Sequence, residues 1–357
     1  MFHPKNLIPM AGSFVFDGEV NALAHACFDK DIFREFWHGF CFHCSHLHVS
    51  QTTELVFRIG NASRPELNGY DYAINVEPSG LCVSAASEND LLLGFMTLID
   101  RIEAIDSEDR TMLQISCCQI HESPVFRTRM AHLCIFPETE LWQIQKFLRF
   151  CGALRYTHVI LEFWGMLKYD CMKELSWKHG YTKEELRPLI REAQDLGLEI
   201  VPMFNHWGHA PCSRGAYGKH VVLDQNPALA TYFSTSGWCW DIRKPKVRAL
   251  MKSIRQELCE LCNSTYFHIG FDEADEHFIR TQEGMDTVCD YLNEIAEDMA
   301  AQGRKIIVWG DIYILTGKRQ ATSPKEMKLS SALAKLIALE FGYDEQWIMT
   351  GEKTSAK

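Results

Sequence analysis

The spacing of hydrophobic and polar positions changes near residue 122. Before that point, short β-rich segments separated by turn residues predict strands at 54–60, 71–78, 81–87 and 111–120. Apolar residues at helical spacing, beginning at residue 88, predict one helix between the last two strands. We therefore expect a small α+β domain at 1–122 that supports the rest of the chain and carries no catalytic group.

From residue 123 onward, strand and helix patterns alternate. Buried strands are predicted at 130–136, 157–163, 198–204, 265–271 and 305–311. Thr182 and Glu185 form a capping box that opens one intervening helix, and Gly197 closes it. The segment "EMKLSSALAKLIALEF" near the end of the chain predicts a further helix. Apolar strands alternating with helices indicate a parallel sheet with helices outside it.

Two architectures fit such a parallel sheet: an open doubly wound sheet or a closed β/α barrel. No Gly-rich phosphate fingerprint follows the first strand, which disfavours a nucleotide-binding doubly wound sheet. In a barrel the carboxyl ends of the strands converge on one mouth, which favours the barrel here because polar residues gather at those ends. These residues are Glu162, Asn205, His206, Asp272, Glu273 and Asp311. We therefore predict an α/β protein with a (β/α)8-type TIM barrel at 123–357.

The predicted barrel is short at its C-terminal end. The fifth predicted strand ends at Asp311, and three more βα units would need roughly 90 residues. We therefore expect a barrel that is truncated, abbreviated or completed by a partner. Exposed edges of such a sheet would make a homo-oligomer useful.

Charge and composition exclude several partners. The net charge of -11 disfavours a nucleic-acid partner, and no run of about 18 apolar residues predicts a membrane span. The N-terminus lacks the pattern of a signal peptide, and several of the 14 cysteines lie in apolar runs, so we expect a cytoplasmic protein with free thiols. The compact segment "CFHCSHLH" at 41–48 is rich in zinc ligands but lacks their usual paired spacing, so we interpret it as a core-facing segment and a polar loop.

One segment, "YFHIGFDEADEH" at 266–277, suggests chemistry. It puts Asp272 and Glu273 side by side after a strand, where only a backbone turn lets both line the mouth. Two carboxylates in one partly buried site acquire different pKa values, so that one is a general acid while the other stays ionised. Glycoside hydrolysis needs these two roles. The alternative is that Asp272 caps the next helix, as we expect of Asp275 and Glu276 near its dipole.

These segments resemble glycoside hydrolase family 20, the β-N-acetylhexosaminidases. "FHIGFDEADE" is similar to the His-x-Gly-Gly-Asp-Glu signature of that family. "YTKEELRPLIREAQDLGLEIVPMFNHWGHA" resembles its helix and third strand, which end in a Gly-His pair, here Gly208-His209. "FRTRMAHL" resembles its first barrel strand, with Arg129 at the position of a substrate-gripping arginine. The resemblance covers roughly residues 7–315 and is closest to the hexosaminidase D-like branch.

The resemblance implies an exo-acting, retaining and substrate-assisted hydrolase of terminal N-acetylhexosamine residues. Glu273 would protonate the glycosidic oxygen and then activate water. Asp272 would orient the 2-acetamido group, whose oxygen attacks the anomeric carbon. No metal or cofactor is expected, and the partner is a carbohydrate. The other implied site residues are Arg129, Glu162, His209, His268, Trp309 and Asp311.

The sequence also departs from the family pattern. Phe271 replaces the second Gly of the signature, and Asn205 stands where many members carry Asp. The family's last pocket tyrosine and tryptophan come from the region this chain lacks, and Tyr343 and Trp347 are poor replacements. Two alternatives therefore stay open. One is a sugar-binding or vestigial barrel without turnover. The other is a metal-dependent hydrolase built on His206, His209, Asp272 and Glu273.

Overall fold

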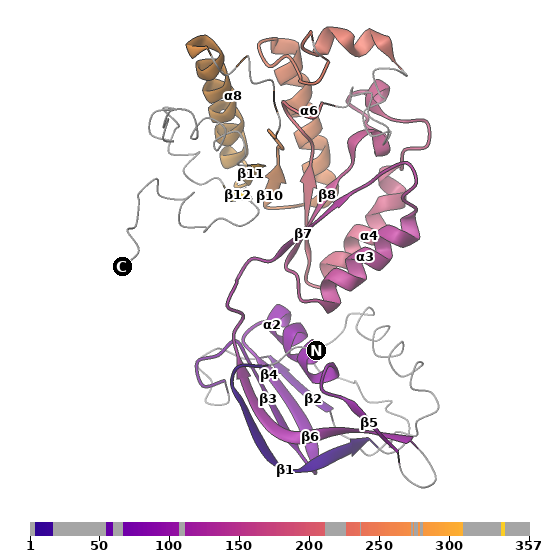
Figure 1. Cartoon of the computed structure of the whole chain (residues 1–357), viewed down its shortest axis with the longest axis vertical. Coiled ribbons are helices and arrows are strands. Elements are labelled where there is room, and N and C mark those ends of the chain that lie inside the picture. Colours follow the sequence, from indigo (N-terminus) through magenta and orange to yellow (C-terminus); the bar gives the residue numbers. More distant parts are fainter. Residues whose placement is uncertain are drawn as a thin grey trace. The chain divides into compact units, whose positions relative to one another are not determined.

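The computed structural model forms two compact units, each with its own β-sheet (Figure 1). The first unit contains residues 1–129, 149–157 and 192–198, and the second contains the remainder. A division into separate domains at 1–122 and 123–357 stays a prediction. The structure describes residues 4–16, 55–59, 67–106, 111–210, 226–235, 237–272, 274, 278, 281–309 and 337–339.

The first unit contains a six-stranded sheet, and among its described residues one helix, α2 (Glu88–Ile99), packs on this sheet. The strand order is β1-β6-β3-β4-β2 with β5 paired to β6, and every pair except β2–β4 is antiparallel. The helix lies close to the sheet, because a Cβ at Gly94 would stand 2.6 Å from Val83 Cγ1. The predicted helix and four strands are confirmed, whereas β1 and β5 were not predicted. The strands are β1 (Leu7–Phe16), β2 (Leu55–Ile59), β3 (Tyr72–Glu77), β4 (Gly80–Ala85), β5 (Glu103–Asp106) and β6 (Thr111–Glu122).

The second sheet contains six parallel strands in chain order. A doubly wound sheet reverses its strand order at a switch point, whereas a β/α barrel keeps chain order. In the described part of the chain, the outermost strands β7 and β12 do not pair with each other. The strands are β7 (Met130–Cys134), β8 (His158–Glu162), β9 (Glu199–Met203), β10 (Tyr266–His268), β11 (Lys305–Trp309) and β12 (Ile337–Leu339).

Helices follow the strands, and Figure 1 shows α3 beside α4 and α6 beside α8. Their bounds are α3 (Leu141–Ala153), α4 (Lys183–Asp195), α6 (Pro245–Cys262) and α8 (Gln282–Ala301). The capping box is confirmed, because Glu185 N donates to Thr182 Oγ1 over 3.2 Å and Thr182 N donates to Glu185 Oε2 over 2.8 Å. None of the helices among the described residues has both the length and the hydropathy that crossing a bilayer requires.

The predicted helix "EMKLSSALAKLIALEF" is wrong at Ile337–Leu339. These residues form β12, which pairs in parallel with β11. A short apolar run such as Ile-Ala-Leu has no periodicity that separates a strand from a buried helix, so only the neighbouring strand decides it.

Along each strand of the second sheet, side chains point alternately to the inner face and to the helix-covered face. A cluster of Ile160, Val201, Met203 and Ile307 lies at its centre, and Trp309 packs against this cluster. Because side chains alternate along a strand, the inward residues of β8 are His158, Ile160 and Glu162. His158 lies at the amino edge of the sheet and Glu162 at its carboxyl edge.

At the amino edge, the half-buried carboxylate of Glu199 accepts several hydrogen bonds from neighbouring residues. Burial alone would raise its pKa, but hydrogen bonds from His158, Thr265 and Ser264 outweigh burial and bring the pKa of Glu199 to about 2. Ser264 Oγ, Thr265 Oγ1 and Thr265 N donate to Glu199 Oε1 over 2.6–2.8 Å. The lowered pKa means that this network stabilises the fold above the unfolded pKa of glutamate and stops doing so as pH falls toward 2.

We expect Glu199→Gln to lower the free energy of unfolding at pH 7 by about 1–2 kcal/mol, after allowing for the solvent exposure of the group. The difference from the parent should shrink as pH falls from 5 to 3, because the parent carboxylate then becomes protonated on unfolding. Urea unfolding at both pH values measures this difference. Glu260→Gln, at an exposed position of α6, serves as the control. An equal loss at both pH values would contradict the assignment.

Candidate active site

Strained backbone gathers at the carboxyl ends of β8, β9 and β10. Trp164, His209 and Phe271 have positive φ angles of 47°, 48° and 76°, respectively. Each such residue costs on the order of 1–3 kcal/mol and persists only where the surrounding structure enforces it. Residues of this kind cluster at active sites, so this edge of the sheet is the place to search for one.

The turn after β10 has the geometry that the paired acids require. Gly270 and Phe271 are both left-handed, with φ of 71° and 76°, so the chain leaves the strand direction immediately before Asp272. Phe271 is fully buried, and its ring lies 5.6 Å from Trp207 and 6.1 Å from Tyr291. The backbone therefore accepts a side chain at the second glycine of the signature by anchoring it in an aromatic cluster.

Gly270 joins three strand ends. Its N–H donates to His268 Nδ1 over 3.0 Å, and its carbonyl accepts from Trp309 N over 2.9 Å. A Cβ at Gly270 would lie 1.5 Å from Asn205 Oδ1. No side chain can therefore stand at residue 270 unless the amide of Asn205 moves.

We expect Gly270→Ala to lower the free energy of unfolding by about 3 kcal/mol, from left-handed strain plus the clash with Asn205. Gly303→Ala is the matched control, since Gly303 also has a φ of 71° but nothing lies within 4 Å of its Cβ position. That control should cost only about 1 kcal/mol. Chemical unfolding of both variants tests the difference, and equal losses would show that the contact with Asn205 is not fixed.

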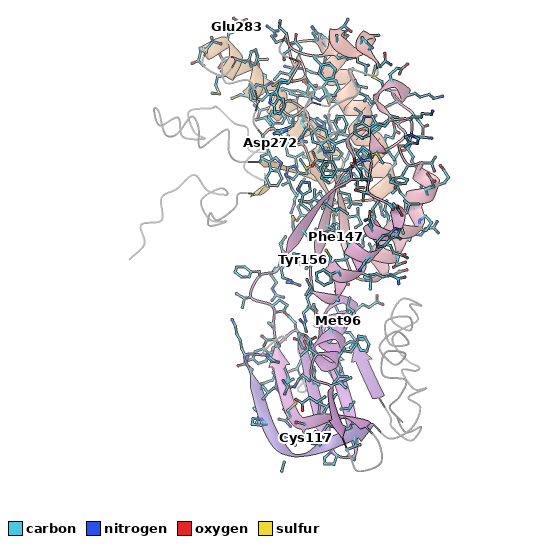
Figure 2. The ribbon with its side chains drawn as sticks, turned by 45° about the vertical axis from the view of Figure 1, so that its right-hand side comes forward. Met96, Cys117, Phe147, Tyr156, Asp272 and Glu283 are labelled. Carbon is cyan, nitrogen blue, oxygen red and sulfur yellow. The ribbon has the colours of Figure 1, made fainter. Side chains whose placement is uncertain are left out.

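Asp272 lies directly after this turn and pairs with His209. The Nε2 of His209 stands 3.3 Å from Asp272 Oδ2, and both side chains are mostly buried. Asp272 is labelled in Figure 2. The loops that carry the two residues touch through their backbones, because a Cβ at Gly208 would lie 2.0 Å from Asp272 O. Asp272 is thus fixed beside a histidine, as a group that orients or stabilises a bound molecule must be.

Aromatic rings enclose His209. The ring of Trp238 lies 4.6 Å from it, and that of Trp164 lies 6.4 Å away in an edge-to-face arrangement. The indole of Trp164 donates to Cys134 Sγ over 2.9 Å, which fixes the indole at the end of β7. Low-dielectric walls of this kind strengthen the interaction between the histidine and its carboxylate.

A second polar group lies on β7 and at the carboxyl ends of β8 and β9. His132 Nε2 stands 3.1 Å from Glu162 Oε2, and Asn205 Nδ2 donates to Glu162 Oε1 over 3.3 Å. Glu162 is 5% exposed and Asn205 4%. The ring of Trp309 lies 5.8 Å from that of His132 and 4.5 Å from that of His268. Glu162 and Trp309 therefore belong to one constellation.

His268 supports this constellation from within the core. It is fully buried, and burial followed by the nearby His132 charge lowers its pKa well below the ordinary value. Its Nδ1 accepts from Gly270, so the neutral ring carries its proton on Nε2, for which the described residues offer no acceptor. A neutral ring of this kind orients Trp309 without adding charge to the site.

Arg129 does not lie at the carboxyl end of a strand, as Glu162 and Trp309 do. Arg129 precedes β7 and so lies at the amino end of that strand, and its guanidinium donates to the carbonyls of Phe126 and Arg155. Its role in gripping a substrate stays a prediction. Glu273 and Asp311 lie outside the described residues, as do Tyr343, Trp347 and the segment 41–48.

Two site residues were not predicted. Neither His132 nor Trp238 lies in a recognisable motif. The one signal for His132 is the alternation of side chains along β7, which places His132 on the inner face of the sheet. Within the part of the chain that the structure describes, no three His, Cys, Asp or Glu side chains are grouped as metal ligands. His206 is fully buried with its Nδ1 2.6 Å from Phe204 O. The metal-dependent alternative therefore has no ligand set among these residues.

Comparison with known proteins supports the predicted resemblance. Residues 158–331 match the family described as glycosyl hydrolase family 20, catalytic domain. The chain is 20% identical over 274 residues to a lacto-N-biosidase of Bifidobacterium bifidum, covering 71% of this chain and 23% of that protein. It is also 20% identical over 289 residues to a beta-hexosaminidase of Porphyromonas gingivalis, covering 68% of this chain and 35% of that protein. The chain thus spans a minor part of both relatives.

Solved structures agree on the fold. A β-N-acetylhexosaminidase of Bacteroides fragilis has a TM-score of 0.67 at 17% identity, covering 95% of this chain and 68% of that one. An exo-β-N-acetylglucosaminidase of Vibrio harveyi, solved with N-acetylglucosamine, has a TM-score of 0.71 at 15% identity, covering 94% and 56%. These similarities confirm the predicted TIM-barrel class. The narrower resemblance to the hexosaminidase D-like branch stays a prediction.

Proposed function

Because residues 158–331 match the catalytic domain of glycosyl hydrolase family 20, we propose that this protein is an exo-acting β-N-acetylhexosaminidase with substrate-assisted, retaining catalysis. The main support is the left-handed turn at Gly270 and Phe271, which brings Asp272 to the carboxyl edge of the sheet beside His209. A carboxylate so positioned suits an acetamido N–H, and Glu273 follows it directly in the chain.

In the proposed reaction Glu273 donates a proton to the glycosidic oxygen as the bond to the anomeric carbon breaks. The acetamido oxygen of the substrate forms a new bond to that carbon and gives an oxazolinium-like intermediate. Asp272 accepts a hydrogen bond from the acetamido N–H and stabilises the positive charge. Glu273 then removes a proton from water, which opens the ring and restores the acetamido group with retained configuration. The chain supplies no nucleophile of its own.

A non-catalytic sugar-binding barrel is the second candidate. It stays a candidate because the two solved structures named above are only 17% and 15% identical to this chain, a level of similarity that shows the fold alone. The two candidates share the same site residues and differ only in turnover.

The deciding assay measures release of an aryl group from β-linked N-acetylglucosaminide and N-acetylgalactosaminide by the purified chain, with and without excess chelator. We expect turnover that the chelator leaves unchanged. Binding of N-acetylglucosamine without release would favour the non-catalytic protein, and loss of activity with chelator would favour the metal-dependent one.

The proposal includes a reducing cytoplasm as the site of action. Cys151, Cys259 and Cys289 are free thiols and are buried, as small hydrophobic residues would be. It also includes assembly with further copies, because in the part of the chain that the structure describes β7 and β12 are the outermost strands of the second sheet.

A further inference from the structure

Four side chains at or near the carboxyl edge form what we call the Glu162 cluster: Glu162, His132, Asn205 and Trp309. The mechanism proposed above uses none of them. Glu162 and Trp309 end β8 and β11, Asn205 follows β9, and His132 lies in the middle of β7. The side chain of Glu162 is 6% exposed. A buried carboxylate must be matched by donors or a cation, or its burial is costly.

The donors present do not fill the capacity of this carboxylate. An ionised carboxylate offers about four acceptor positions on its two oxygens. Among the described residues, each oxygen has one partner, His132 Nε2 at 3.1 Å or Asn205 Nδ2 at 3.3 Å. The Oδ1 of Asn205 is also buried without a donor in the described chain. The Glu162 carboxylate therefore keeps acceptor positions that the described donors do not use, and a ligand that donates a hydrogen bond would fill one of them.

The neighbouring groups narrow the class of ligand. A cation is disfavoured because His132 Nε2 already directs its proton at the carboxylate. Trp309 offers an aromatic face 5.8 Å from the ring of His132, whose side chain is 32% exposed and marks the accessible side. A pyranose combines an apolar C–H face with hydroxyl donors at its edge, so it matches both features.

We propose that the Glu162 cluster binds a hydroxyl group of the terminal hexosamine, with Glu162 accepting its hydrogen bond. Asn205 connects the cluster to the proposed catalytic residues, because its amide lies against Gly270, two residues before Asp272. His132 is then a positioning residue that holds the carboxylate in place. This inference rests on the proposed function and assigns to Glu162 a specificity-determining role in the same site.

The test compares Glu162→Gln and His132→Gln with the parent on an aryl N-acetyl-β-glucosaminide and on its 3-, 4- and 6-deoxy analogues. We expect Glu162→Gln to lower kcat/KM about 10–100-fold on the full substrate, as for the loss of a hydrogen bond to a charged group. On one deoxy analogue the same variant should match the parent within about threefold. His132→Gln should show the same pattern with a loss of about 3–10-fold.

Ratios between substrates are independent of the fraction of folded enzyme, so a partly unfolded variant still gives a result. His179→Gln, at an exposed position outside the cluster, is the control and should behave as the parent. An equal loss on all four substrates would overturn the inference and leave Glu162 as a structural group.

If the parent shows no turnover, the proposed hydrolysis fails and binding decides the inference instead. Calorimetric titration with N-acetylglucosamine and its deoxy analogues would then be compared between the parent and Glu162→Gln. The subsite would be supported if the variant bound N-acetylglucosamine at least tenfold more weakly than the parent but bound one deoxy analogue as tightly as the parent. Equal binding, or no binding by the parent, would overturn it.

Discussion

Glu273→Gln is expected to lower kcat for an aryl N-acetyl-β-glucosaminide about 10²–10⁴-fold, because the amide can neither donate the proton to the leaving oxygen nor accept one from water. Glutamine keeps the size of the side chain, so the fold and the affinity for N-acetylglucosamine should change little. Steady-state kinetics together with product binding separate these two effects.

The loss should depend on the leaving group. An acidic phenol needs little protonation to leave, so the variant should lose least on a dinitrophenyl substrate and most on an alkyl or sugar aglycone. Glu276→Gln, three residues along the same segment, is the control and should retain activity, because that acid is expected only to complement a helix dipole. Equal loss in both variants would point to a general effect of charge.

Asp272→Asn is expected to lower kcat/KM about 10²–10³-fold on substrates that carry the acetamido group. The Asp272 carboxylate stands 3.3 Å from His209 Nε2 and follows a turn that Gly270 and Phe271 fix. The variant would keep this shape but lose the negative charge that faces the developing oxazolinium ion.

The matched measurement uses an aryl β-glucoside, which has a hydroxyl in place of the acetamido group. Parent and variant should hydrolyse it at equally low rates, since no acetamido group is present to be oriented. Asp290→Asn, at an exposed position of α8, serves as the control for loss of one negative charge. An equal loss on both substrates would show that Asp272 acts on something other than the acetamido group.

Much of the fold follows from periodicity alone. The strands around Ile160, Val201 and Ile307 are continuous apolar runs, and the capping box at Thr182 and Glu185 marks a helix start, so both were predictable. β12 was not predictable, because a three-residue apolar run becomes a strand only through its parallel neighbour β11. A turn after β10 was predictable, because Asp272 and Glu273 could not both line the mouth without one. The left-handed backbone of Phe271 in that turn was not predictable.

The site divides in the same way. Asp272 and His209 carry motif positions, and the structure brings them together. His132 carries none, and its pairing with Glu162 depends on the register that sets β7 beside β8. A sequence pattern shows which residues end a strand, whereas the contacts between strand ends depend on pairing between segments far apart in the chain.

The most direct test of the account is the rate of hydrolysis of aryl 2-acetamido substrates in which the acetyl group carries zero, one, two or three fluorine atoms. Fluorine makes the acetamido oxygen a weaker nucleophile without blocking the pocket. If that oxygen attacks the anomeric carbon while Asp272 steadies the resulting charge, kcat should fall steeply with each added fluorine. A kcat that stays constant across the series, or the absence of turnover on the parent substrate, would contradict the proposed mechanism.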